Sequence, residues 1–227
     1  DLTINLIEKF GAKVHRNGYR EFEVEGTGYQ SPKSYLIEGD ATGATYFAAA
    51  AAIGGELEIY GLPKDCAQGD IKFMDVLKAM GAKVSFGDNS VIVKKSKLHG
   101  IEIDMNAMPD AAMTLVPLAL YTDSPVVIKN IASWRVKETD RIQAMVNEMS
   151  KLGVNVSSGH DYISIDASVR NDATPTFDTY NDHRMAMAFA PLALVFKQVD
   201  IEEPHVVEKS YPMYWEHLTA QGFDIEE

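Results

Sequence analysis

Residues 134–141 read WRVKETDR and gather three cations and two acids around a tryptophan. On a helix, Lys137 and Arg141 would be four residues apart and share a face, with Glu138 three residues before Arg141. The two cations could then bind an anion, while Glu138 donates or accepts a proton. The alternative is a solvated helix start, where each intrahelical ion pair contributes only a few tenths of a kcal/mol.

Other charged residues extend this candidate site. Arg184, in NDHR, falls in the first turn of an expected helix, where a cation opposes the helix dipole. That placement suggests a guanidinium that binds an oxyanion, although an ordinary exposed arginine is the alternative. Asp110 precedes another apolar run and is either a functional carboxylate or simply a helix N-cap. Lys209, in VEKSYP, carries little signal by itself.

The overall charge narrows the class of partner. The 227 residues hold 33 acids against 21 Lys and Arg, a formal charge of −12. This argues against nucleic acid but leaves room for a small anion in a local pocket. The longest apolar stretch, 185–196, is shorter than the roughly 20 residues of a membrane helix, so we expect no membrane association. The six histidines lack ligand spacing, so we expect no metal.

The one cysteine, Cys66, excludes an internal disulfide framework and favours a reducing, cytoplasmic location. A small buried apolar side chain is its default interpretation. The chain opens with DLTINLIEKFG, without methionine and in the middle of a helical pattern. We therefore expect it to be a fragment of a longer protein.

The elements that must position these residues form a repeat. Four glycines, each after an amphipathic helix and before an alternating strand, are 70, 72 and 69 residues apart. Three aspartates that precede apolar runs keep the same period, 70 and 72 residues apart. Coincidental spacing is the alternative, but two landmarks in step favour one repeated unit. The glycines are Gly11, Gly81, Gly153 and Gly222, and the aspartates are Asp40, Asp110 and Asp182.

The predicted unit is helix, strand, helix, strand, strand, with a further strand such as 101–105 leading into the next aspartate. We predict an α/β fold with three such units after Asp40, and 1–38 as the tail of another, joined through a linker at 29–35. If the units share an axis, the helix N-termini at the three aspartates converge. Converging N-termini would attract an anion despite the net negative charge.

Four motifs, taken together, resemble the EPSP synthase (3-phosphoshikimate 1-carboxyvinyltransferase) family, bacterial type. They are EGDATGATYF, MPDAAMT, WRVKETDR and YNDHRMAM, in order and with matching gaps over the whole chain. The resemblance implies an enolpyruvyl-transferase-type domain of repeated βαβαββ units, an inside-out α/β barrel. It assigns 1–38 to the tail of the N-terminal domain's last repeat and the hinge, and 39–227 to the C-terminal domain of three repeats. The N-terminal half, with its own substrate contacts, would be the missing partner, so we expect this chain alone to be inactive.

The family transfers the enolpyruvyl group of phosphoenolpyruvate to the 5-hydroxyl of shikimate 3-phosphate and releases phosphate, without metal or organic cofactor. By position, the resemblance makes Asp110 the acceptor of the hydroxyl proton and Glu138 the donor to the methylene carbon. Lys137 would contact shikimate 3-phosphate. Ser133 stands where the bacterial pattern has asparagine, and it either contacts substrate with a shorter reach or caps a helix. The residues expected to bind phosphoenolpyruvate are Arg141, Arg184 and Lys209.

Two alternatives stay open at this point. The related enzyme that acts on UDP-N-acetylglucosamine shares the fold but uses a cysteine in a flexible loop, and KDCAQGD around Cys66 does not resemble that loop. A non-catalytic anion-binding module is the other alternative. The acids beside the cations argue against it, because a simple anion binder does not need them.

Overall fold

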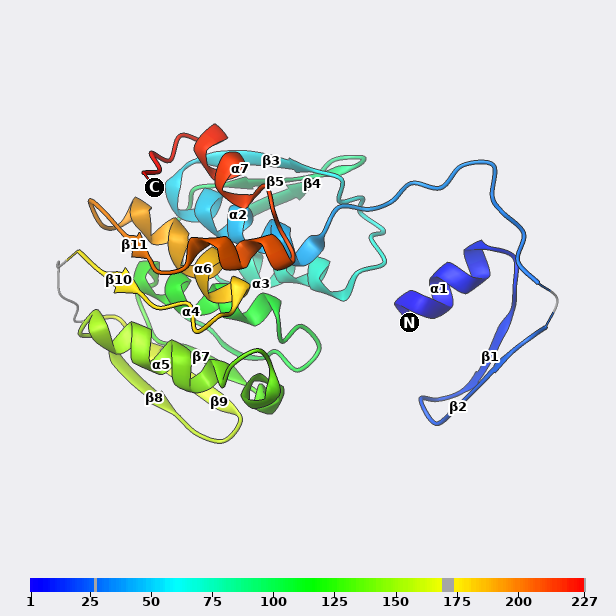
Figure 1. Ribbon diagram of the computed structural model, residues 1–227, viewed down its shortest axis with the longest axis horizontal. Helices are drawn as coiled ribbons and strands as arrows, with labels where there is room; N and C mark the ends of the chain where they lie inside the picture. Colours follow the sequence, from blue (N-terminus) through cyan, green and yellow to red (C-terminus); the bar gives the residue numbers. More distant parts are fainter. Residues whose placement is uncertain (27, 169–173, 227) are drawn as a thin grey trace.

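The computed structural model describes residues 1–26, 28–168 and 174–226. Figure 1 shows a larger α/β body and a small N-terminal part to one side, joined by an extended stretch of chain. The small part consists of α1 (Leu2–Lys9) and the antiparallel pair β1 (Val14–Asn17) and β2 (Glu21–Val24). The stretch at 29–35, predicted as a linker, contains no helix or strand.

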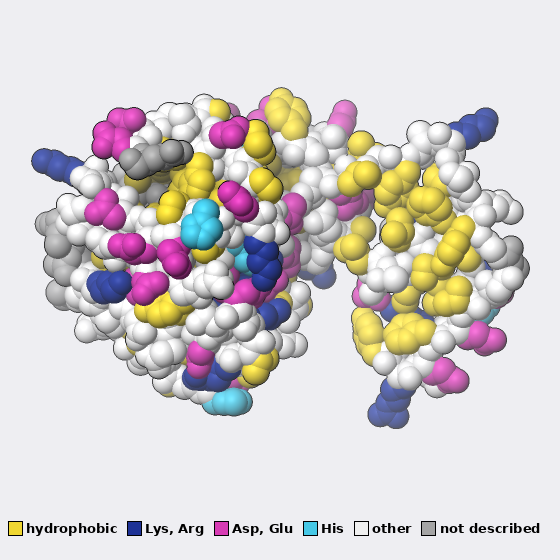
Figure 2. Space-filling model, in the orientation of Figure 1, with side chains coloured by type: hydrophobic (Ala, Val, Ile, Leu, Met, Phe, Trp, Pro, Cys, Tyr) yellow, Lys and Arg dark blue, Asp and Glu magenta, His cyan; other side chains and the backbone are white. Residues whose placement is uncertain are grey.

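The N-terminal part leaves apolar side chains uncovered. No residue of α1 is buried, and Leu2, Leu6, Phe22 and Val24 are each exposed by more than two fifths. Figure 2 shows hydrophobic side chains spread over this part of the molecule. A helix and a two-stranded ribbon of this size cannot build a core alone.

The middle unit contains every predicted element. Its strands form a four-stranded sheet in the order β6-β7-β9-β8, in which β6 is parallel to β7 and the other pairs are antiparallel. The βαβαββ unit is thereby confirmed here. In chain order it consists of β6 (Glu102–Asp104), η2 (Ala111–Thr114), α4 (Leu115–Leu118), η3 (Ala119–Tyr121), β7 (Val126–Lys129), η4 (Ala132–Val136), α5 (Arg141–Lys151), β8 (Asn155–Ser158) and β9 (Tyr162–Asp166).

The first unit has the same order from its first helix onward, and its strands form the antiparallel sheet β3-β5-β4. It consists of α2 (Ala41–Gly54), β3 (Glu56–Tyr60), η1 (Gly69–Lys72), α3 (Phe73–Ala79), β4 (Lys83–Phe86) and β5 (Ser90–Lys94).

The third unit is the least regular. Its two short strands, β10 and β11, pair in parallel. A strand was predicted after Gly222, but the described residues up to 226 contain none there, so that prediction is wrong for the described chain. The elements are β10 (Thr176–Phe177), α6 (His183–Phe189), η5 (Ala190–Leu194), β11 (Asp200–Ile201), η6 (Pro204–Lys209) and α7 (Tyr214–Ala220).

The repeat glycines end their helices as predicted. Gly11, Gly81, Gly153 and Gly222 have φ values of 81°, 101°, 72° and 93°. A side chain is disfavoured in this region, which explains why the residue type recurs at each helix end. The space around Gly81 is tighter than that around Gly11 or Gly222, since a Cβ there would lie 2.9 Å from the carbonyl oxygen of Lys97.

The first helix of each unit is buried, and proline decides how regular it is. Helix α2 has no proline and runs for 14 residues, 12 of them buried. The equivalent runs contain Pro117 and Pro191, and they break into short α and 3-10 pieces because proline lacks an N–H and clashes with the preceding turn. Figure 1 shows α2, α4 and α6 between the two larger sheets. Within the described chain, no helix combines the length and apolarity needed to cross a bilayer.

Candidate functional site

The three landmark aspartates do not behave alike. Asp40 and Asp182 cap their helices, accepting hydrogen bonds of 2.9 Å from the backbone N–H groups of Thr42 and Arg184. Asp110 precedes η2 but makes no capping hydrogen bond. The interpretation of Asp110 as a simple N-cap is therefore wrong, and its carboxylate is available for other contacts.

Asp110 lies among cations from two other segments. One carboxylate oxygen is 2.8 Å from Nη1 of Arg141 and 3.6 Å from Nζ of Lys137, and the other is 3.1 Å from Nη2 of Arg184. Burial alone would raise the pKa of Asp110, but the charges of Arg184 and Arg141 outweigh it and lower the pKa. Asp110 is thus ionised at neutral pH.

WRVKETDR does not form one helix. Residues 132–136 make the 3-10 turn η4, Lys137 is extended (φ −90°, ψ −153°), and α5 begins only at Arg141, capped by Asp140. The predicted shared helix face of Lys137 and Arg141 is therefore wrong. The two cations meet through their common partner Asp110 instead. Trp134 is buried and anchors the turn by donating from Nε1 to the carbonyl oxygen of Pro109, at 2.6 Å.

Arg141 is the buried centre of the cluster, with only 1% of its side chain exposed. Its Nε donates to Asp182 at 2.7 Å, Nη1 to Asp110 at 2.8 Å and Nη2 to Glu138 at 2.9 Å. A guanidinium committed to three carboxylates organises the acids of the site. Direct contact between Arg141 and a substrate anion stays a prediction.

Glu138 and Lys209 form an ion pair across 71 residues, with 24% and 58% of their side chains exposed. Desolvation raises the pKa of Glu138, but the hydrogen bond from Lys209 and the charge of Arg141 lower it to about 2. Glu138 is accordingly a carboxylate here and has no proton to donate. The sequence around Lys209 did not indicate this contact, because Lys209 lies in η6 of the third unit and its partner Glu138 lies in the second unit.

Arg184 combines burial with an unused donor. Its side chain is 15% exposed, Nη2 pairs with Asp110, and Nη1 donates to the hydroxyl of Tyr46 at 3.3 Å. Within the described residues, Nε has no hydrogen-bond partner. A cation in the first turn of α6 with an unsatisfied N–H is suited to an oxyanion, as the sequence suggested.

His183 was missed by the sequence reasoning, although it stands inside the NDHR motif. It is 4% exposed, and its Nδ1 lies 3.6 Å from Asp182 without a hydrogen bond among the described residues. Burial and the charge of Arg184 lower the pKa of His183, so the imidazole is neutral at neutral pH. Only its place between two charged residues could have indicated it.

Ser133 does not join the cluster. The N-cap position of η4 is Ile131, and Ser133 lies exposed inside the turn with no side-chain hydrogen bond to a described residue. The N-cap interpretation of Ser133 is wrong. A substrate contact stays a prediction.

The contact network therefore holds four cations and three carboxylates, an excess of positive charge in a chain of net charge −12. Among the described residues, no group of three or more metal-ligating side chains could hold a metal ion. The absence of metal and organic cofactors stays a prediction. The cations are Lys137, Arg141, Arg184 and Lys209, and the acids are Asp110, Glu138 and Asp182.

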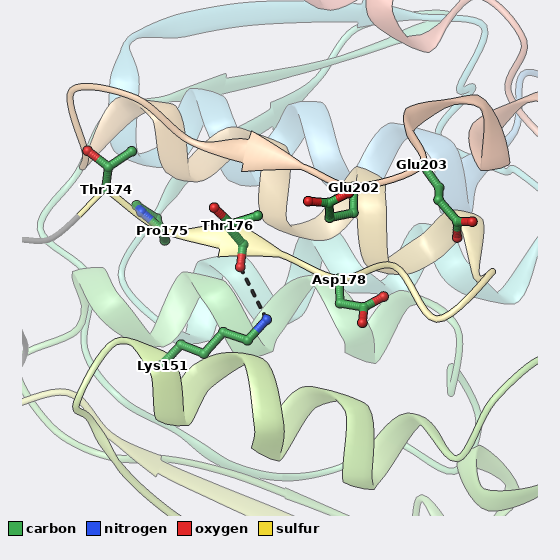
Figure 3. A pocket seen from close by; sticks show the side chains of 7 residues that line it. All are labelled: Lys151, Thr174, Pro175, Thr176, Asp178, Glu202 and Glu203. Atoms are coloured by element: carbon green, nitrogen blue, oxygen red, sulfur yellow. Dashed lines mark hydrogen bonds between the residues drawn. The ribbon is translucent and has the colours of Figure 1, made fainter.

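A separate groove of about 760 Å³ lies between α5 and β10 (Figure 3). Its lining includes the carboxylates of Asp178, Glu202 and Glu203, and the ammonium of Lys151, which pairs with Glu148 at 2.5 Å. Acids without free cations repel anions. The polar cluster around Asp110, and not this groove, is the candidate anion site.

The fold is of the enolpyruvyl-transferase type. The chain superposes on EPSP synthase from Acinetobacter baumannii with a TM-score of 0.83 and 24% identity, covering 100% of this chain and 55% of that one. It superposes on the enolpyruvyl transferase NikO from Streptomyces tendae with a TM-score of 0.76 and 20% identity, covering 98% and 52%. At such identities the likeness shows the fold alone.

Sequence comparison gives the family. The family model described as EPSP synthase (3-phosphoshikimate 1-carboxyvinyltransferase) matches residues 1–218, and the chain belongs to that family. The 3-phosphoshikimate 1-carboxyvinyltransferase of Shewanella piezotolerans is 46% identical over 222 residues, which are 97% of this chain and 52% of the relative. That of Buchnera aphidicola is 48% identical over the same shares. The chain thus spans about half the length of the curated relatives it matches.

Proposed function

We propose that the protein to which this chain belongs transfers the enolpyruvyl group of phosphoenolpyruvate to the 5-hydroxyl of shikimate 3-phosphate. The observation that carries the proposal is the pair of ionised carboxylates, Asp110 and Glu138, held by one buried guanidinium, Arg141. Addition needs a base for the hydroxyl and an acid for the methylene carbon, close enough to serve one small site. The family membership supports the same reaction.

In this proposal Asp110 takes the proton of the 5-hydroxyl as its oxygen bonds to C2 of phosphoenolpyruvate. The methylene carbon C3 gains a proton from Glu138, which gives a tetrahedral adduct. The C2–O bond to phosphate then breaks, C3 returns its proton to Glu138, and the leaving phosphate takes from Asp110 the proton of the 5-hydroxyl. Asp110 and Glu138 thereby regain the protonation states in which the addition began, and no oxidant or metal enters the balance.

The low pKa of Glu138 fits this scheme only if substrate raises it. Lys209 is the main group that lowers that pKa, through its hydrogen bond to the carboxylate. When the anionic groups of phosphoenolpyruvate bind Lys209 and Arg184, Lys209 moves away from Glu138, and the pKa of Glu138 rises. The proton donor would thus be formed by binding. Lys137, on the other side of Asp110, is the cation proposed for the phosphate of shikimate 3-phosphate.

The alternatives receive less support. Burial, with the Glu38 carboxylate as the second cause, raises the pKa of the Cys66 thiol to about 11, unlike that of a reactive cysteine. This disfavours a cysteine-dependent transfer to UDP-N-acetylglucosamine. A non-catalytic anion-binding module leaves the paired carboxylates without a role.

We also infer that residues 1–38 belong to another domain and hinge, and 39–227 to the domain carrying this site. The uncovered apolar residues of α1 and β2 support that division, because they need a further partner surface. The N-terminal half of the relatives is the proposed partner, and it would supply the remaining substrate contacts. A cytoplasmic location stays a prediction.

The experiment is phosphate release by the full-length protein from phosphoenolpyruvate, with and without shikimate 3-phosphate. We expect release that depends on both substrates, and almost none from the 227-residue chain alone. Adding a separately produced N-terminal half to this chain should restore part of the activity. A full-length protein that binds both substrates without releasing phosphate would favour the non-catalytic module.

A further inference from the structure

A second buried charge on α5 has no part in the proposed reaction. Glu148 follows Arg141 by seven residues, two turns along the same face of the helix, and its side chain is 0% exposed. A carboxylate is rarely fully buried unless its partners satisfy it. The identity of those partners shows what Glu148 holds in place.

The partners of Glu148 come from the segment that leads into the candidate site. One oxygen accepts a hydrogen bond of 2.7 Å from the hydroxyl of Tyr180. The other accepts from the backbone N–H of Asp178 at 3.0 Å and from Nζ of Lys151 at 2.5 Å. Lys151 also donates to the carbonyl oxygen of Thr176 at 3.2 Å (Figure 3). Helix α5 therefore contacts this segment at Thr176, Asp178 and Tyr180.

The segment that α5 contacts contains an unfavourable backbone turn. Tyr180 and Asn181 have φ values of 53° and 56°, a region that bulky L-residues rarely adopt, and they do so consecutively. Such a conformation persists only where surrounding contacts fix it. Burial and the Glu148 hydrogen bond raise the pKa of Tyr180 to about 12, which keeps its hydroxyl protonated as a donor.

The turn ends at the residues of the site. Asp182 follows directly; it caps α6 through the N–H of Arg184 and accepts from Arg141. Helix α5 thus holds segment 178–184 at both ends, with Glu148 before the turn and Arg141 after it. Arg184, whose Nη2 lies 3.1 Å from Asp110, is carried at the end of that segment.

We propose that Glu148 is a positioning residue for Arg184: by binding Tyr180 and the N–H of Asp178, it fixes the left-handed turn that aims the guanidinium at the substrate anion. The inference rests on the proposed function, in which Arg184 binds phosphoenolpyruvate. It adds a residue that lies outside the contact network of the site.

The test uses the full-length protein with Glu148→Gln and Tyr180→Phe. Tyr180→Phe is the milder change, because it removes one hydroxyl and keeps the carboxylate and the ring. We expect the KM for phosphoenolpyruvate to rise about tenfold, while the KM for shikimate 3-phosphate changes less than about twofold, since one charge-assisted contact is misplaced. The matched control is Met149→Ala, which empties a buried position at the next residue of α5.

A second readout does not depend on activity. Amide hydrogen exchange over 178–184 should be faster in both variants than in the wild type, and unchanged in β6 and β7. If the wild-type full-length protein releases no phosphate, the proposed function is wrong. The hydrogen-exchange result alone then tests whether Glu148 fixes segment 178–184. Unchanged exchange over 178–184 in both variants would show that Glu148 does not fix this segment. Faster exchange with an unchanged KM for phosphoenolpyruvate, or an equal KM shift in Met149→Ala, overturns the positioning of Arg184.

Discussion

Nε of Arg141 lies 2.7 Å from a carboxylate oxygen of Asp182, and these two side chains are 1% and 0% exposed. The contact joins the N-terminus of α5 in the second unit to that of α6 in the third. Each group depends on the other, because an isolated buried charge is very costly. The interface between two repeats is therefore held by the ion pair that also organises the candidate site.

Removing Arg141 should destabilise the chain strongly. Arg141→Leu leaves the carboxylates of Asp182 and Asp110 without their buried partner, and we expect a loss of about 3–5 kcal/mol in the free energy of unfolding. Urea unfolding measures it. The exposed pair Lys129–Glu102 is the control, where Lys129→Ala should cost less than about 1 kcal/mol. Equal costs for the two variants would show that the buried pair is not structural.

The ion pair of Glu138 should make part of the stability depend on pH. Its pKa in the folded chain, about 2, lies below the ordinary glutamate value of 4.5, so its contribution to stability is present above about pH 4.5 and is lost as the pH falls toward 2. The stability difference between wild type and Glu138→Gln should therefore be constant near neutrality and shrink in acid. Unfolding curves at several pH values measure this difference. A difference that does not change with pH would contradict the shifted pKa.

Cys66 should react slowly with alkylating reagents. Burial and the Glu38 carboxylate, 3.1 Å from Sγ, raise the thiol pKa to about 11. At pH 8 the thiolate fraction is then on the order of 10²-fold below that of a free cysteine, and alkylation slows accordingly. Glu38→Gln should speed it up. The rate of labelling by iodoacetamide, compared with that of free cysteine, tests the point, and comparable rates would refute it.

Two repeat glycines should differ in their tolerance of a side chain. Gly222→Ala meets only the left-handed backbone penalty of about 1–2 kcal/mol, since no atom lies within 4 Å of its Cβ position. Gly81→Ala adds a Cβ that would lie 2.9 Å from a carbonyl oxygen, so we expect a larger loss. Thermal unfolding of both variants gives the comparison. An equal loss would mean that backbone conformation alone sets the cost.

Periodicity predicted the helix ends and most strands because caps and alternation are local signals. It could not predict that Pro117 and Pro191 break the buried helices into shorter pieces, or that the third unit lacks a strand after Gly222 in the described residues. Those outcomes depend on local sterics and on tertiary pairing.

The candidate site was predicted in composition but not in geometry. A helix through WRVKETDR would have placed Lys137 and Arg141 side by side. The backbone of Lys137 is extended instead, so the two residues do not share a helix. Residue spacing within one segment also does not report contacts between units. The pairing of Lys209 with Glu138 and the burial of His183 therefore could not be predicted from the sequence.

The central claim is that Asp110 and Glu138 perform the proton transfers. Its most direct test is turnover by the full-length protein carrying Glu138→Gln or Asp110→Asn, together with the Kd for phosphoenolpyruvate. We expect turnover to fall about 10²–10⁴-fold in each variant, with the Kd changed far less, and no effect from the control Glu202→Gln in the other groove. Near-normal turnover in both variants would contradict the account.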